Sequence, residues 1–263
     1  MRLHMDRIMV GFLCSKASRH IIPAYAKRNA IPLTRDVTRR YGSYRDFFLR
    51  RVPREPDMDP EHLISPCDGW MSVFDITGDA SFFIKNSVYT VDDLIGDAEL
   101  ASRYRGGICI ILRLCASDYH HYCYIDDAYQ GSNHFIEGEL HSVQPAACEK
   151  YPVFVLNRRS WCLMDTDNFG PVVQTEIGAL VVGGITNLCE NCRVHRGQDK
   201  GHFDLAGSTI VLLFEPGRIV IRKDLLEKLK TEEEVRVLQG MWIGSRADTL
   251  QPKQAYPASP EEQ

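Results

Sequence analysis

The N-terminal segment has no apolar run long enough to cross a membrane, and no small-residue cleavage site follows its short apolar stretch. That stretch, Ile8–Cys14 (IMVGFLC), is far shorter than the roughly 20 residues that a spanning helix needs. A secretory signal would carry a cleavage site after its apolar core, so that interpretation is excluded as well. The segment is expected either to lie on a membrane surface or to pack as an ordinary amphipathic helix on its own domain.

The sequence also lacks the cysteine patterns of a disulfide framework or of a zinc site. Its nine cysteines are an odd number, they are scattered, and several lie inside apolar runs. The single C-x-x-C, Cys189–Cys192, has no second C-x-x-C and no suitably spaced pair of histidines, so it is a weak signal for zinc or redox chemistry. We expect reduced thiols, a cytoplasmic location and no bound metal.

Charge is distributed unevenly along the 263 residues. Residues 1–40 contain nine Lys or Arg and two Asp, a net +7 within a chain whose total is −4, so the remainder carries −11. A basic N-terminus of this kind indicates a surface for anionic lipid or nucleic acid. The hydrophobic content of 44% and the charged content of 25% are ordinary for a soluble globular protein.

Helical patterns are concentrated near the N-terminus. Residues 5–30 have a helical pattern that Pro23 is expected to interrupt, and Ser43–Arg51 predicts a second short helix, which the proline-rich residues 52–60 end. We therefore expect a basic helical, membrane-facing segment over residues 1–50, a single core over 51–248 and a disordered tail over 249–263.

The core is dominated by strand patterns. GICIILRL is rich in β-branched residues, VFVL-NRR-SWCLM and STIVLLF-EPG-RIVI are each typical of a hairpin, and PVVQTEIGALVVGGI predicts two strands separated at Gly178. SVYTVDDLIGDAELASRY and KDLLEKLKTEEEV each predict one helix. The predicted class is α+β, a β-rich single core with N-terminal amphipathic helices.

Four segments of the core carry chemically interesting residues. They are ISPCDGW (Ile64–Trp70), SDYHHYCYIDD (Ser117–Asp127), EGELHSVQP (Glu137–Pro145) and DLAGSTIVLLF (Asp204–Phe214). Each taken alone has a structural explanation, such as a Pro-Cys-Asp-Gly turn or a packed histidine pair. Their combination and order make a functional interpretation stronger.

In that order, the segments resemble the phosphatidylserine decarboxylases, a family of self-cleaving, pyruvoyl-dependent enzymes. The resemblance runs from about Tyr41 to Gly244. It is carried by eight colinear segments: YRDFFLR, LISPCDG, IKNSVYTVDDLIGD, DYHHYCYIDD, VFVLNRRS, FGPVVQTEIGALVVGGI, KGHFDLAGSTIVLLF and VLQGMWIG.

The resemblance implies that the chain cleaves itself between Gly207 and Ser208. Residues 1–207 would form the β chain and residues 208–263 the α chain. The Ser208 hydroxyl attacks the Gly207 carbonyl, the acyl group moves from nitrogen to oxygen, and β-elimination followed by hydrolysis leaves a pyruvoyl group and ammonia. That covalent cofactor would form a Schiff base with phosphatidylserine, accept the electrons released with CO2, and yield phosphatidylethanolamine.

A hydroxyl needs a general base, and the base needs an orienting group. Asp68 matches the family pattern as the carboxylate, and His120 matches the first histidine of the family's Tyr-His-x-x-His element. Cys123 occupies the second histidine position of that element. His120 is the first choice for the base and His141 the second, while His121 and a Cys123 thiolate remain alternatives.

The expected partners follow from the implied substrate. They are phosphatidylserine in an anionic membrane, the chain's own cleaved pieces and a second copy of the chain, with no nucleic acid. The protein is expected to be peripheral on the cytoplasmic face of the cell membrane. Alternatives are a decarboxylase of a free amino acid such as tryptophan, and a lipid-binding homologue that does not mature.

Overall fold

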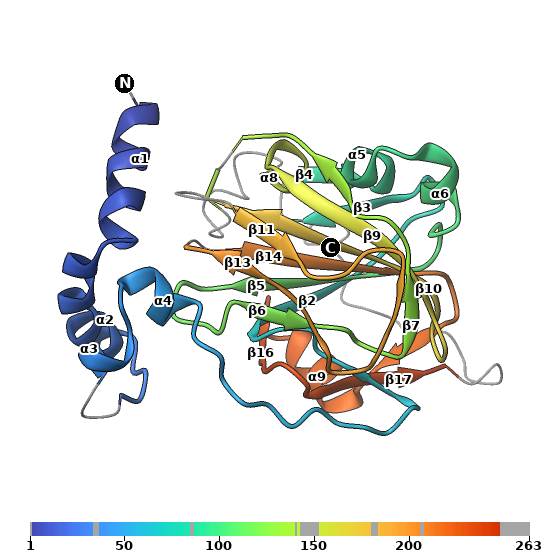
Figure 1. The fold of residues 1–263 in the computed structure, drawn as a ribbon. Helices are drawn as coiled ribbons and strands as arrows, with labels where there is room; N and C mark the ends of the chain where they lie inside the picture. Colours follow the sequence, from blue (N-terminus) through green and yellow to red (C-terminus); the bar gives the residue numbers. More distant parts are fainter. Residues whose placement is uncertain are drawn as a thin grey trace.

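The computed structural model describes residues 2–33, 37–84, 87–139, 141–142, 153–179, 184–205 and 208–247. A nine-stranded antiparallel sheet lies at its centre (Figure 1). The strands follow the order β12-β7-β9-β10-β14-β5-β2-β16, and β8 also pairs with β9. Their bounds are β2 Gly69–Asp75, β5 Ile108–Leu114, β7 Ala128–Gln130, β8 His134–Ile136, β9 Arg159–Thr166, β10 Gly170–Gly178, β12 Cys192–Val194, β14 Ser208–Phe214 and β16 Val235–Val237.

Strand β14 is buried on both faces, which explains its uninterrupted apolar sequence. Side chains alternate between the two faces of a strand. Ile210, Leu212 and Phe214 therefore belong to one hydrophobic core, called the first core, whereas Val211 and Leu213 belong to the second core on the other face. Strand β5 divides its side chains between the same two cores.

Each face of the large sheet is covered by a different set of elements. The first core is closed by the sheets β1-β17-β15 and β11-β13-β6 and by helix α9. The second core is closed by α5, α6, α8 and the β3-β4 hairpin. The bounds are β1 His62–Ile64, β3 Ser81–Ile84, β4 Ser87–Thr90, β6 His121–Cys123, β11 Gly184–Asn187, β13 Asp199–Asp204, β15 Ile219–Ile221, β17 Trp242–Arg246, α5 Val91–Ile95, α6 Ala98–Ser102, α8 Val153–Leu156 and α9 Lys223–Leu229.

The N-terminal helices form a separate small cluster beside the sheet (Figure 1). They are α1 Arg2–Leu13, the 3₁₀ helix η1 Lys16–Ile21, α2 Ile22–Arg28, α3 Val37–Arg40 and α4 Tyr44–Phe48. Pro23 lies in the first turn of α2, where its missing N–H costs nothing, and the Ser43 side chain caps α4 by accepting from the Asp46 N–H. Phe47 and Phe48 of α4 pack with Leu205 of the core.

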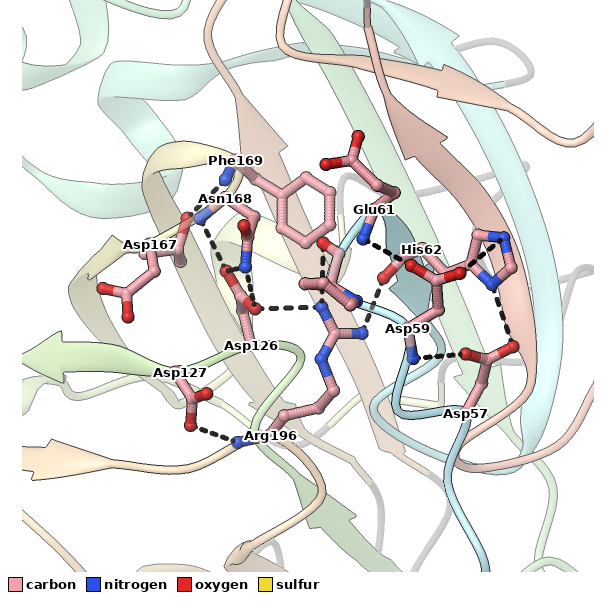
Figure 2. A network of polar contacts seen from close by, with 12 residues as sticks. Asp57, Asp59, Glu61, His62, Asp126, Asp127, Asp167, Asn168, Phe169 and Arg196 are labelled. Carbon is pink, nitrogen blue, oxygen red and sulfur yellow. Dashed lines mark hydrogen bonds and ion pairs between the residues drawn. The ribbon is translucent and has the colours of Figure 1, made fainter.

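A buried ion pair joins Asp126, in the loop after β6, to Arg196, which also bonds the segment before the central sheet (Figure 2). The Arg196 guanidinium lies 2.9 Å from the Asp126 carboxylate and donates to the carbonyl of His62 at 2.6 Å. Asn168 donates to the other side of Asp126, and the Asp127 carboxylate accepts from the Arg196 N–H. The two aspartates that end the SDYHHYCYIDD segment therefore serve the fold.

The structure confirms the α+β class, with a β-rich core and N-terminal helices. Three local predictions were wrong. Val153–Leu156 is a helical turn rather than a strand, because four residues are too few for periodicity to decide and Val153 and Phe154 pack in the second core. The strands β14 and β15 both exist, but they do not form a hairpin with each other, since β15 pairs with β17. The region of α5 and α6 also contains two helices instead of one, separated by Gly96 in the left-handed conformation (φ 70°).

The expectation that all cysteines are reduced was wrong for one pair. Cys189 and Cys192 form a disulfide, and the other six described cysteines are free thiols. Among the described residues, no helix is both long enough and apolar enough to span a membrane. The expected tail over 249–263 lies outside the described residues.

A second buried ion pair lies beneath the sheet β11-β13-β6. The Lys200 ammonium and the Glu176 carboxylate are 2.8 Å apart, and both side chains are fully buried. Gln174 donates to the same carboxylate oxygen at 2.9 Å, and the Asn187 amide oxygen accepts from Lys200 at 3.1 Å. Both charges are thereby paired and hydrogen-bonded, as a dry interior requires.

We predict that Lys200→Met destabilises the fold by about 3–5 kcal/mol, because it leaves the Glu176 charge buried without its partner. Urea denaturation followed by fluorescence measures the change, in a Ser208→Ala background so that the expected self-cleavage does not complicate unfolding. Lys230→Met is the matched control, since Lys230 pairs with Glu227 at the surface, where such a pair contributes about 1 kcal/mol or less. Equal effects of the two substitutions would contradict the prediction.

Candidate active site

Ser208 is the first residue of the central strand β14. It lies opposite Gly178 of β10 and Leu114 of β5, and it is 1% exposed. The predicted cleavage partner Gly207, with Ala206, lies outside the described residues. Leu205, just before them, is buried and has φ 38°, a conformation that a bulky residue adopts only under constraint from its surroundings. Leu205 is therefore itself held in a strained, enclosed conformation three residues before Ser208.

His120 is fully buried, and its ring lies against Phe48 of α4, with ring centroids 4.2 Å apart. Its Nδ1 lies 3.0 Å from the Asp118 carbonyl oxygen, which can only accept a hydrogen bond. Nδ1 therefore carries the proton, and Nε2 is the basic atom of the neutral ring. The His120 carbonyl accepts from the Phe203 N–H at 2.9 Å, which connects this histidine to the strand that leads to Ser208.

His121 has a different environment, although it is the next residue. Its Nδ1 lies 3.2 Å from the Asp199 carboxylate, and its Nε2 lies 3.2 Å from the Leu49 carbonyl oxygen. Both partners accept, so both ring nitrogens donate together only when the ring is protonated. With both ring nitrogens engaged by acceptors, His121 is a poor candidate for the base.

Asp68 lies in the turn before β2 and is buried. Its carboxylate receives the Arg54 guanidinium at 2.5 Å and the Gln239 backbone N–H at 2.9 Å. The Gln239 side chain in turn donates to the carbonyls of Pro66 and His121. The predicted carboxylate thus lies beside the histidine strand β6, where its contacts with Arg54 and Gln239 hold it in place.

His141 is connected to the neighbourhood of Ser208 through its backbone. The Asn157 side chain bonds both the N–H and the carbonyl of His141, and it also donates to the carbonyl of Gly178, the residue opposite Ser208. The His141 ring itself is 37% exposed and lies 2.7 Å from Glu139. Its assignment as second choice for the base stays a prediction.

The structure argues against Cys123 as a thiolate base. The residue is buried in the first core, and burial, with the Asp199 charge, raises the pKa of its thiol to about 12. At neutral pH the group is a neutral thiol that packs as a small apolar side chain.

Sequence reasoning missed how much the N-terminal segment contributes to this site. Arg45 binds Asp204 with two parallel hydrogen bonds, Arg51 lies 3.1 Å from Asp199, and Arg54 binds Asp68. Phe48 and Leu49 contact the two histidines. The signal was present in the printed sequence as arginines interleaved with aromatic residues in YRDFFLRR and in Arg54 beyond it.

Comparison with known proteins decides the family. A model of the family described as phosphatidylserine decarboxylase matches residues 44–245. The chain is 38% identical to phosphatidylserine decarboxylase proenzyme 2 of Clostridium acetobutylicum over 247 residues, which cover 92% of this chain and 84% of that protein. It is 40% identical to the phosphatidylserine decarboxylase proenzyme of Clostridium beijerinckii over 212 residues, 78% of this chain and 72% of the relative.

The chain belongs to the phosphatidylserine decarboxylase family. It is therefore placed among the carboxy-lyases, as its eight colinear segments predicted. The family match begins at Tyr44, the first residue of α4. The region that matches the phosphatidylserine decarboxylase family therefore includes the helix that contacts His120. It also includes the arginines that bind Asp204, Asp199 and Asp68.

His202 lies next to His121 across the β6-β13 pair, with ring centroids 5.1 Å apart. Burial, followed by the charge of His121, lowers the pKa of His202 below its usual 6.5. As the pH falls, the unfolded chain therefore binds a proton at His202 at a higher pH than the folded protein does. Stability from this residue is present above pH 6.5 and is lost as the pH falls through 6.5 toward the lowered folded pKa.

We predict that His202→Gln makes the fall in stability between pH 7.5 and pH 5.5 shallower than in the parent protein, because it removes this proton uptake by the unfolded state. The free energy of unfolding in urea at three pH values measures the slope, again in the Ser208→Ala background. His195→Gln serves as the control because His195 is 75% exposed. An unchanged slope in His202→Gln would refute the prediction.

Proposed function

We propose that the protein is a self-cleaving, pyruvoyl-dependent phosphatidylserine decarboxylase that converts phosphatidylserine to phosphatidylethanolamine and CO2. The observation that carries the proposal is the position of Ser208, buried at the first residue of the central strand and three residues after Leu205, whose φ is 38°. The curated relatives named proenzymes support processing of the chain.

Self-cleavage requires a proton acceptor for the Ser208 hydroxyl. His120 is the residue best prepared for this role, because the Asp118 carbonyl fixes its tautomer and Phe48 fixes its ring. Ser208 Oγ attacks the Gly207 carbonyl carbon, the C–N bond breaks, and an ester forms in its place. Loss of the Ser208 α-proton then expels the Gly207 carboxylate, and hydrolysis of the remaining dehydroalanine releases ammonia.

The residues around Ser208 fit a pyruvoyl group derived from it. The position is enclosed by β10 and β5, so bulk water is largely excluded, and the group remains joined to a strand that cannot shift. When formed, the group supplies an electron sink for the electrons released with CO2. In the mature enzyme His120 holds the proton that returns to the substrate α-carbon, with the same ring orientation that serves cleavage.

We predict that the purified protein runs as two pieces, residues 1–207 and 208–263, and that intact mass shows the smaller piece lacking the elements of ammonia relative to a serine N-terminus. Ser208→Ala is expected to remain a single uncut chain, and His120→Gln to cleave more slowly by about 10²–10⁴-fold, the usual contribution of a general base. A wild-type protein that stays uncut, indistinguishable from Ser208→Ala, would exclude the proposal and favour the non-maturing lipid-binding alternative.

The cleaved preparation also decides the substrate. Release of CO2 is measured from phosphatidylserine vesicles, from free serine and from free tryptophan, with Ser208→Ala as the blank. Turnover of phosphatidylserine alone supports the proposed function. Turnover of a free amino acid without turnover of the lipid would replace it with the soluble-substrate alternative.

We further propose that the N-terminal helices hold the enzyme on the cytoplasmic face of an anionic membrane. Ile8, Met9 and Phe12 of α1 are 73%, 42% and 45% exposed, and Figure 1 shows α1 extending away from the sheet. Exposed basic residues follow on η1 and α2, including Lys16 and Arg28. Apolar side chains beside basic ones are the features of a helix that lies in a lipid interface.

We predict that the triple variant Ile8→Ser/Met9→Ser/Phe12→Ser binds phosphatidylserine-containing vesicles at least about tenfold more weakly. Burial of one such side chain contributes about 1.5–3 kcal/mol, and about 1.4 kcal/mol corresponds to a tenfold change. Vesicle sedimentation measures binding, and Val88→Ser/Leu188→Ser is the control because both residues are exposed but lie on the core. Undiminished binding of the triple variant would refute this role.

A further inference from the structure

Arg50, the second residue after α4, differs from the other arginines of its segment. Its guanidinium is half-buried, with Cζ 4.6 Å from the centre of the Phe47 ring, and Nη1 donates to the Phe47 carbonyl at 3.1 Å. Arg45, Arg51 and Arg54 each bind a carboxylate. Within the part of the chain that the structure describes, no carboxylate lies within ion-pair distance of Arg50.

The surroundings of Arg50 do not compensate its charge. Four tyrosines surround it: Tyr25, Tyr41, Tyr44 and Tyr119. Burial raises the pKa of the Tyr25, Tyr44 and Tyr119 hydroxyls, so these groups are neutral at physiological pH. The nearby Asp118 carboxylate is already engaged by Arg236 at 2.7 Å and by the Cys115 N–H at 2.7 Å.

Burial lowers the pKa of Arg50 from its usual value, yet a guanidinium remains charged at any physiological pH. A partly desolvated cation without an anion is costly, and only one of its five N–H groups has a protein acceptor. Among the residues that the structure describes, no partner is seen for the remaining donors, and their planar, forked arrangement suits a phosphate or a carboxylate.

Arg50 also lies within reach of the candidate active site. Phe48, two residues earlier, packs on His120, and Leu49 contacts His121. Tyr119, one of the four tyrosines, directly precedes His120 and stacks on His121 with ring centroids 5.1 Å apart. The loop that carries Tyr119 follows β5, whose last residue, Leu114, lies opposite Ser208.

We propose that Arg50 binds the phosphodiester of the lipid headgroup, and so selects a phospholipid over a free amino acid. The proposal rests on the proposed function. The carboxylate is the less suitable ligand, because a cation that stabilises it in the bound substrate would oppose its loss as CO2. The phosphodiester keeps its charge throughout the reaction, so an arginine can hold it from binding to product release.

The test compares Arg50→Gln and Arg50→Lys with Arg105→Gln, which removes the same charge from an exposed residue of the core. Arg50→Gln is expected to cleave like the parent protein and to bind vesicles equally well. Its KM for phosphatidylserine is expected to rise about 10–100-fold with little change in kcat, the size of effect of a lost charged hydrogen bond. Arg50→Lys keeps the positive charge but loses the forked pair of donors. Its KM for phosphatidylserine is therefore expected to lie between the KM of the parent protein and that of Arg50→Gln.

Two soluble competitors identify the group that Arg50 binds. Dihexanoyl phosphatidylethanolamine has the phosphodiester without the carboxylate, and serine has the carboxylate without the phosphodiester. Arg50→Gln is expected to weaken binding of the first by about 10–100-fold and to leave the second unchanged. The reverse pattern, or equal binding by parent and variant, overturns the proposal.

The design also separates this proposal from the proposed function. If the parent protein does not decarboxylate phosphatidylserine, the proposed function fails, while calorimetric binding of dihexanoyl phosphatidylethanolamine to the parent and to Arg50→Gln still tests Arg50. If Arg50→Gln does not fold, Arg50→Lys decides, since it keeps the charge and must show the weakened phosphodiester binding. A parent-like Arg50→Lys would then overturn the proposal.

Discussion

The pairing of β14 on both of its edges is the constraint on which the rest of the structure depends. All seven residues of the strand pair with β10 on one side and with β5 on the other, and their side chains fill both cores. A strand held in this way cannot slip in register without moving apolar side chains to the wrong face. Ser208, the first residue of the strand, is therefore held in place by both neighbouring strands.

The N-terminal helices are a second part of the same site. Arg45 binds Asp204, and Phe47 and Phe48 pack with Leu205, so α4 holds the chain just before the predicted cleavage bond. The same helix places Phe48 on His120 and Leu49 beside His121. The small helical cluster that includes α4 thus also contacts the two histidines of the candidate active site.

The sequence nominated candidate residues for the site, but it did not predict the contacts that assemble them. Ser208, Asp68 and His120 lie in short local motifs, and a turn or a strand end can be recognised from neighbouring residues alone. The contacts of Arg54 with Asp68 and of Phe48 with His120 join separate segments, and no local pattern specifies them.

The fold shows the same division between local patterns and non-local contacts. The strand β5 followed from its β-branched residues, whereas the pairing of β15 with β17 instead of β14 depends on non-local packing. The short helix α8 was mistaken because Val153 and Phe154 satisfy a core contact that overrides their strand propensity.

The same topology explains how the protein could survive cleavage before Ser208. The piece that begins at Ser208 contains β14, β15, β16, α9 and β17, whereas most of their partners lie in the other piece. Strand β14 sits between β10 and β5, β16 pairs with β2, and β17 pairs with β1. Separating the two pieces would therefore expose both hydrophobic cores and break four strand pairings, at a cost close to that of unfolding the core itself. A cut before Ser208 would leave these pairings intact, because none of them depends on the bond that would break. The proposed cleavage at the entry to a doubly paired strand would therefore create a new N-terminus without separating Ser208 from β10 and β5.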